Sequence, residues 1–67
     1  MALKIHKFPG KFDYATMEQS KYSPEMISVY GHKKGAKWFV ASFYDEDEAA
    51  ELEAKIDRGE RVNPEDY

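Results

Sequence analysis

Histidines and carboxylates are the side chains of this sequence that could carry out acid–base or metal chemistry. The chain of 67 residues has two histidines, His6 and His32, no cysteine and 13 acidic residues. The histidines belong to different predicted elements, and no acid stands beside them at the spacing of a known metal-ligand set. Four consecutive acids at 45–48 are expected to be solvated, and a general acid needs burial to shift its pKa. We therefore expect a protein that is not an enzyme and that has no metal site and no cofactor.

The acidic run at 45–48 has the pattern of a helix start. Asp45 is a favoured N-cap residue, and Glu48 three residues later completes a capping box for a helix over 46–58. Acids in the first turn also suit the positive end of the helix dipole, and Gly59 is placed to end the helix. This capping role explains the acids without any partner. An apolar stripe on this helix predicts the side that packs on a sheet: Ala49, Leu52 and Ile56.

Three segments have the composition and alternation of β-strands, namely 3–8, 25–31 and 37–44. Gly35, in the loop between the second and third segments, can supply the positive φ of a hairpin turn. The connection 11–24 holds no sustained period, so we expect it to be irregular. The spacing of Thr16 and Gln19 could start one helical turn within it.

These elements predict one α+β domain over 1–67, with a three-stranded antiparallel sheet packed on one C-terminal helix in the order βββα. Residues 60–67 are expected to form a C-terminal tail. If Tyr30 lies opposite Trp38, one sheet face is uniformly apolar and meets the helix: Leu3, Ile5, Ile27, Val29, Phe39, Ala41 and Phe43. The other face then exposes an aromatic patch, unless the connection folds across it: Tyr30, Trp38 and Tyr44.

Charge divides the chain into two halves of opposite sign. Residues 1–44 hold seven lysines and three acids, a net charge of +4, whereas residues 45–67 have a net charge of −7. Such a division suits an anionic partner on one side, a cationic partner on the other, or attraction between the sheet and the helix.

One hypothesis is nucleic-acid binding through the sheet. In it, a basic group at the predicted hairpin contacts phosphates: His32, Lys33, Lys34 and Lys37. The aromatic residues of the exposed face would stack on bases or wedge between them. A β-sheet can also enter a major groove, so this hypothesis includes duplex DNA.

The segment KWFVASFYDEDEAAELEAKI resembles the strand, helix-cap and helix pattern of the Apetala-type plant DNA-binding domain and of the arm-type domains of tyrosine integrases. Ser42-Phe43 and Ala49-Ala50 carry the resemblance, which covers about 25–57. It implies a three-stranded sheet with a helix behind it that reads DNA through outward side chains. Lys37 and Trp38 fall near the reading positions of those families.

The second hypothesis is a protein-binding inhibitor or adaptor. In length, acidity and aromatic content the chain is similar in type to the small proteins with which phages block host defence or transcription, anti-CRISPR proteins among them. That likeness implies occlusion of a host protein that handles nucleic acid. Acidic side chains would stand in for phosphates, and the aromatic patch could anchor the interface instead. The acidic set is Asp45, Glu46, Asp47, Glu48 and Glu51.

The net charge of −3 favours the protein-binding hypothesis, because a negative protein is repelled by a polyanion. Self-association in a homodimer, through the aromatic face or through the edge strands, is a third hypothesis. No apolar run has the length of a spanning helix or of a signal peptide, so we expect a cytoplasmic protein with no membrane contact.

Overall fold

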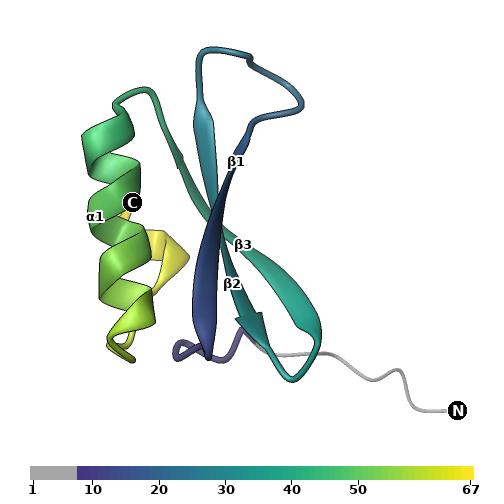
Figure 1. Ribbon diagram of the computed structural model, residues 1–67, viewed down its shortest axis with the longest axis vertical. Coiled ribbons are helices and arrows are strands. Elements are labelled where there is room, and N and C mark those ends of the chain that lie inside the picture. Colours follow the sequence, from purple (N-terminus) through teal and green to yellow (C-terminus); the bar gives the residue numbers. More distant parts are fainter. Residues whose placement is uncertain (1–7) are drawn as a thin grey trace, which may run out of the picture.

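The computed structural model describes residues 8–67 and shows an antiparallel sheet followed by one helix that lies along one of its faces (Figure 1). The sheet order is β1-β2-β3. The predicted α+β fold with βββα order is confirmed within this part of the chain. The elements are β1 (Tyr14–Gln19), β2 (Ile27–Lys33), β3 (Ala36–Phe43), α1 (Glu46–Asp57) and a short 3₁₀ helix η1 (Pro64–Asp66).

The first strand of the sheet is not the predicted one. The prediction over 3–8 lies outside the described residues except for Phe8, which is not in a strand. β1 takes that place, so the irregular connection and helical turn predicted within 11–24 are wrong. The alternation of β1 is weak, because its inward residues are only Ala15 and Met17 and its outward residues include a tyrosine. A small inward side chain gives little periodic signal.

The hairpin between β2 and β3 has the turn that its sequence predicts. Lys33 pairs with Ala36, and the two residues between them, Lys34 and Gly35, have φ values of 50° and 82°. Two consecutive positive φ values define the two-residue turn whose twist matches that of the strands. The Lys34 amide also donates to Asp13 Oδ2 at 3.1 Å, which fixes the hairpin tip to the residue before β1.

A β-bulge in β3 changes the predicted register. Val29 pairs with Ala41 but Tyr30 pairs with Phe39, so Val40 has no partner on β2. Because of this extra residue, the residues of β3 before Val40 lie on the opposite sheet face from the one predicted. Phe39 is 52 % exposed on the face away from the helix, and Trp38 packs against the core. The prediction that Phe39 faces inward and Trp38 outward is therefore wrong.

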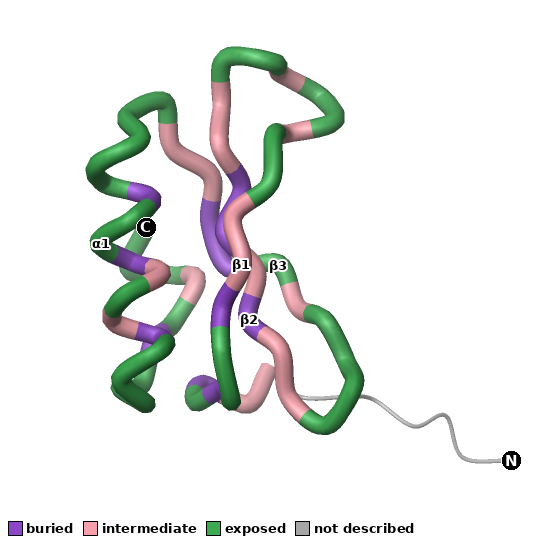
Figure 2. The backbone as a smooth tube through the Cα atoms, in the orientation of Figure 1, coloured by how far each residue is buried: buried purple, intermediate pink, exposed green. Residues whose placement is uncertain are grey.

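The core lies between α1 and the sheet. The predicted stripe of Ala49, Leu52 and Ile56 is confirmed, since each is at most 2 % exposed. These buried positions lie on the side of α1 turned to the sheet (Figure 2). Across from them the sheet contributes a further set of buried side chains: Ala15, Val29, Val40 and Ala41.

Both ends of α1 are capped at the predicted residues, but the Asp45 side chain bonds to the amide of Asp47 and not to that of Glu48, so the predicted capping box does not form. Asp45 Oδ1 accepts a hydrogen bond from the Asp47 amide at 2.9 Å. At the other end, Gly59 has φ of 81°, and the Gly59 and Glu60 amides donate to the carbonyls of Ile56 and Lys55. This pair of bonds is the Schellman arrangement, which satisfies two of the last carbonyls. The helix ends at Asp57, one residue before its predicted end.

The predicted C-terminal tail over 60–67 packs on the rest of the molecule. The Val62 amide donates to the Gly10 carbonyl at 2.8 Å, and the Val62 side chain is 2 % exposed. η1 follows and brings Tyr67 to the end of β3, where its ring meets that of Phe43 edge to face. The segment thus adds one side chain to the core and one ring beside α1.

The outer edge of β1 is covered by an acid of the helix. Asp57 Oδ1 accepts a hydrogen bond from the Ala15 amide at 2.9 Å, and Ala15 is 8 % exposed. We expect Asp57→Ala to lower the free energy of unfolding by about 1–2 kcal/mol, because it leaves a buried amide without a partner. Urea denaturation followed by circular dichroism measures the change. Glu65→Ala removes an exposed acid as a control, and an equal loss in both variants would contradict the edge role.

Candidate functional site

The structure places the predicted site residues on opposite sides of the sheet. Glu48 and Glu51 lie on α1, which covers one face, while Tyr30, His32 and Lys37 lie on the face away from the helix. Two surfaces of different chemistry result, and each is built by a different set of elements.

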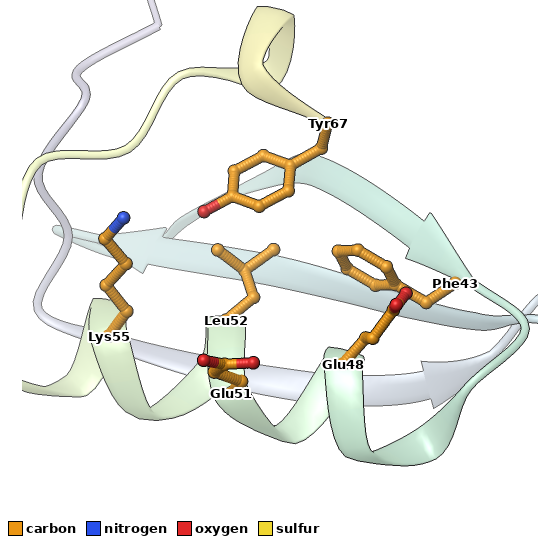
Figure 3. A pocket seen from close by; sticks show the side chains of 6 residues that line it. All are labelled: Phe43, Glu48, Glu51, Leu52, Lys55 and Tyr67. Atoms are coloured by element: carbon orange, nitrogen blue, oxygen red, sulfur yellow. The ribbon is translucent and has the colours of Figure 1, made fainter.

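The first surface is a cleft beside α1, here called the acidic cleft. It has a volume of about 410 Å³ and is lined by Phe43, Glu48, Glu51, Leu52, Lys55 and Tyr67. The Tyr67 ring lies above Leu52, with Phe43 and Glu48 on one side of it and Lys55 on the other (Figure 3). The floor is apolar and the rim carries charges.

Helical spacing sets the rim of the acidic cleft. Glu48 is four residues before Leu52, and Glu51 is four residues before Lys55, so these pairs lie along one side of α1. The Phe43 and Tyr67 rings meet at 5.8 Å with an interplanar angle of 83°. Within residues 8–67 neither carboxylate is in an ion pair. Both are therefore available to a cation from a partner.

Only part of the predicted acidic set lines this cleft. Asp45 uses its carboxylate to cap α1, whereas Glu46 and Asp47 are exposed in the first turn outside the cleft. The sequence did not predict the apolar side chains of the cleft as site residues. Phe43 and Leu52 were predicted to be core residues, and nothing in the sequence indicates that Tyr67 returns to the end of β3.

The second surface is the sheet face without a helix, here called the open face. Its side chains form three groups of contacts across the strands and are Tyr14, Thr16, Glu18, Ser28, Tyr30, His32, Lys37, Phe39 and Ser42. The Tyr14 and His32 rings stack at 4.5 Å with an interplanar angle of 2°, and His32 Nε2 lies 2.8 Å from Thr16 Oγ1. Cross-strand pairs of this kind stabilise a sheet, so the open face is ordered before any partner binds.

The basic group predicted at the hairpin is divided by these contacts. Lys37 pairs with Glu18 and lies 4.3 Å from the centre of the Tyr30 ring. Its hydrogen bond to Glu18 raises the pKa of Lys37 above its usual value. His32 is held by its stacking and its hydroxyl contact. Lys33 ends β2 and Lys34 is exposed in the turn, and neither is in an ion pair in the described part of the chain.

The three predicted aromatic anchors do not share one surface. Tyr30 lies on the open face, whereas the Trp38 ring is 5.9 Å from that of Phe12 on the helix side. Tyr44 follows β3 and is 72 % exposed. The open face shows other rings instead: Tyr14 and Phe39. Phe39 was missed because the bulge cannot be read from the alternation of β3.

Among residues 8–67 no three histidine, aspartate or glutamate side chains gather closely enough to hold a metal ion. Within that range no helix has the length and apolar character needed to cross a membrane. The sequence matches no protein-family model, and searches of curated proteins and of solved structures find no similar protein.

Proposed function

We propose that this protein is a non-enzymatic binding module that covers a basic surface of a partner protein, in particular one that handles nucleic acid. The observation that carries the proposal is the acidic cleft, in which two carboxylates that have no ion pair with any of residues 8–67 border an apolar floor. A partner of the opposite charge is the natural complement of such a rim.

The chemistry of the acidic cleft suits a lysine or arginine side chain. The aliphatic stem of such a residue would lie against Leu52 and the rings of Phe43 and Tyr67. Its cationic end would then reach Glu48 or Glu51, with the Tyr67 ring offering a cation–π contact. Lys55 at the other end of the cleft would repel a second cation and so favour one orientation.

The distribution of charge supports a protein partner on this side. Residues 45–67, which supply α1 and η1, carry a net charge of −7. A surface this negative attracts the basic grooves that bind nucleic acid and repels nucleic acid itself. The partner's groove would be occluded because the acids take the places of phosphates.

The test is affinity capture of the tagged protein from a lysate, with and without nuclease, read by mass spectrometry. The double variant Glu48→Gln with Glu51→Gln should reduce capture of a specific protein at least ten-fold, since each charge-assisted contact contributes about 1.5–3 kcal/mol. Glu46→Gln with Asp47→Asn removes the same charge from the same helix outside the cleft. It should leave capture within about two-fold of wild type, because surface charges alone contribute little.

Three results would count against this function. Captured proteins could disappear after nuclease treatment, the two double variants could lose binding equally, or no protein could be enriched. Circular dichroism of each variant shows that the fold is intact, so that a loss of capture reports on the surface.

A further inference from the structure

A second cleft lies on the open face and is unrelated to the acidic cleft. Its volume is about 380 Å³, and its lining residues are Ser20, Lys21, Tyr22, Ser28, Tyr30, Phe39 and Ser42. The connection between β1 and β2, at the top of Figure 1, forms one wall, and β2 and β3 form the floor. We call it the open-face pocket.

Aromatic rings dominate the walls of the open-face pocket. Phe39 is 52 % exposed, and Tyr22 is 97 % exposed at the rim. The Tyr30 and Phe39 rings meet at 5.8 Å and 72°, so their faces are turned in different directions. Rings that are exposed at a cleft can stack on a flat, aromatic ligand.

The connection that carries Tyr22 is held in place by its own hydrogen bonds. The Ser20 amide donates to the Met26 carbonyl and the Met26 amide donates to the Ser23 carbonyl, both at 3.0 Å. Ser20 Oγ accepts from the amide of Tyr22 at 3.2 Å. The wall therefore exists without a ligand, which lowers the entropy cost of binding.

Polar groups of the open-face pocket are hydroxyls and one cation. Ser28 Oγ and Ser42 Oγ are 3.0 Å apart on the floor, and Ser28 is 4 % exposed. Each hydroxyl keeps acceptor capacity after this contact. Lys21 is the charged residue of the lining, and no carboxylate belongs to it. These groups suit a flat ligand that has hydrogen-bonding edges and is linked to negative charge.

We propose that the open-face pocket binds one unstacked base of a single-stranded nucleic acid. The base would stack on the ring of Tyr22 or Phe39 and turn an edge to the hydroxyls of Ser28 and Ser42. Lys21 would contact the adjacent phosphate. A duplex keeps its bases paired and stacked, so it cannot offer one to a pocket without first opening.

The acidic half of the molecule does not prevent this binding. Most of its acids lie on α1 and η1, and α1 is on the opposite side of the sheet (Figure 1). Packed layers are about 10 Å apart, and the screening length at physiological ionic strength is about 8 Å. Repulsion is therefore weak at the open face. The segment that builds the sheet, residues 8–44, holds five lysines and three acids.

Fluorescence anisotropy with a labelled single strand of about 12 nucleotides tests the proposal. The full chain should bind this strand more tightly than the duplex of the same sequence. Tyr22→Ala should weaken binding roughly ten-fold, the loss of one stacking contact. Lys21→Gln should reduce the slope of log K against log salt by about 0.7, as expected for one phosphate contact to a single strand.

Tyr67→Ala is the matched control, because it removes a tyrosine ring from the acidic cleft on the other side of the molecule. It should leave binding of the single strand unchanged and reduce capture of the protein partner, whereas Tyr22→Ala should do the reverse. The two proposals can therefore fail separately. Tyr22 is 97 % exposed, so its loss does not remove core packing.

Three outcomes would overturn the base-binding role: no binding of the single strand, equal binding of strand and duplex, or equal affinity of Tyr22→Ala and wild type. Loss of protein capture on Tyr22→Ala, with oligonucleotide binding unchanged, would assign the open-face pocket to a protein instead.

Discussion

Gly31→Ala should lower the free energy of unfolding by about 1–3 kcal/mol, the usual cost of overpacking a core. A Cβ atom on Gly31 would lie 2.5 Å from two atoms of the Phe12 ring. That ring cannot move aside easily, because it is 6 % exposed and meets the rings of Phe8 and Trp38 at 5.2 and 5.9 Å. A core of this size supplies only about 3–5 kcal/mol in total, so the variant should lose a large share of its stability.

Urea denaturation measures this loss, and a compensating variant identifies its cause. Phe12→Ala removes the Cγ and Cδ atoms that the new methyl group would strike. The double variant Gly31→Ala with Phe12→Ala should therefore be more stable than the sum of the two single changes predicts, because residues in contact are not additive. Strict additivity, or a Gly31→Ala variant as stable as wild type, would show that the ring does not require this glycine.

Ile56→Ala should be the most damaging change in the helix. The Ile56 side chain is fully buried in the core between α1 and the sheet. Truncating a buried isoleucine to alanine costs about 2–5 kcal/mol, which equals most of the stability expected for a chain of this size. The variant should therefore be largely unfolded at 25 °C.

A graded series separates packing from other effects at this position. Ile56→Val removes one methylene and should cost about 0.5–1.5 kcal/mol while leaving a cooperative transition. Ala54→Ser changes an exposed residue of the same helix and should cost less than either. Thermal melting by circular dichroism ranks the three variants. A cooperative Ile56→Ala transition near that of wild type would mean that the core does not depend on this side chain.

The helix could be predicted because its signals are local. Asp45 and Gly59 act through the few residues next to them, and the apolar stripe repeats within one segment. For the sheet, only the fold class could be predicted. The alternating side chains of β1 are mostly small or polar and give little signal. The sheet face on which Trp38 and Phe39 lie depends on how β3 pairs with β2. Pairing of this kind is decided by tertiary contacts.

The contrast between local signals and tertiary contacts also explains which residues of the candidate sites could be predicted. Glu48 and Glu51 belong to the acidic set that was predicted from composition alone, and helical spacing places both of them on one side of α1. Tyr67 and Tyr22 were missed because each reaches its cleft through a segment without a period, and the contacts that hold those segments are long-range or specific to one loop. Sequence patterns reveal regular elements more readily than the irregular segments that complete a site.

The bulge at Val40 also bears on how this strand can vary between related chains. Phe39 and Ala41 already point to opposite faces, as adjacent residues do in a regular strand. Loss of the Val40 codon would straighten the strand and remove one buried side chain, yet each neighbour would keep its face. Loss of one codon in the turn before it would instead disturb the pairing. Evolutionary searches for this fold should therefore tolerate a one-residue gap at Val40.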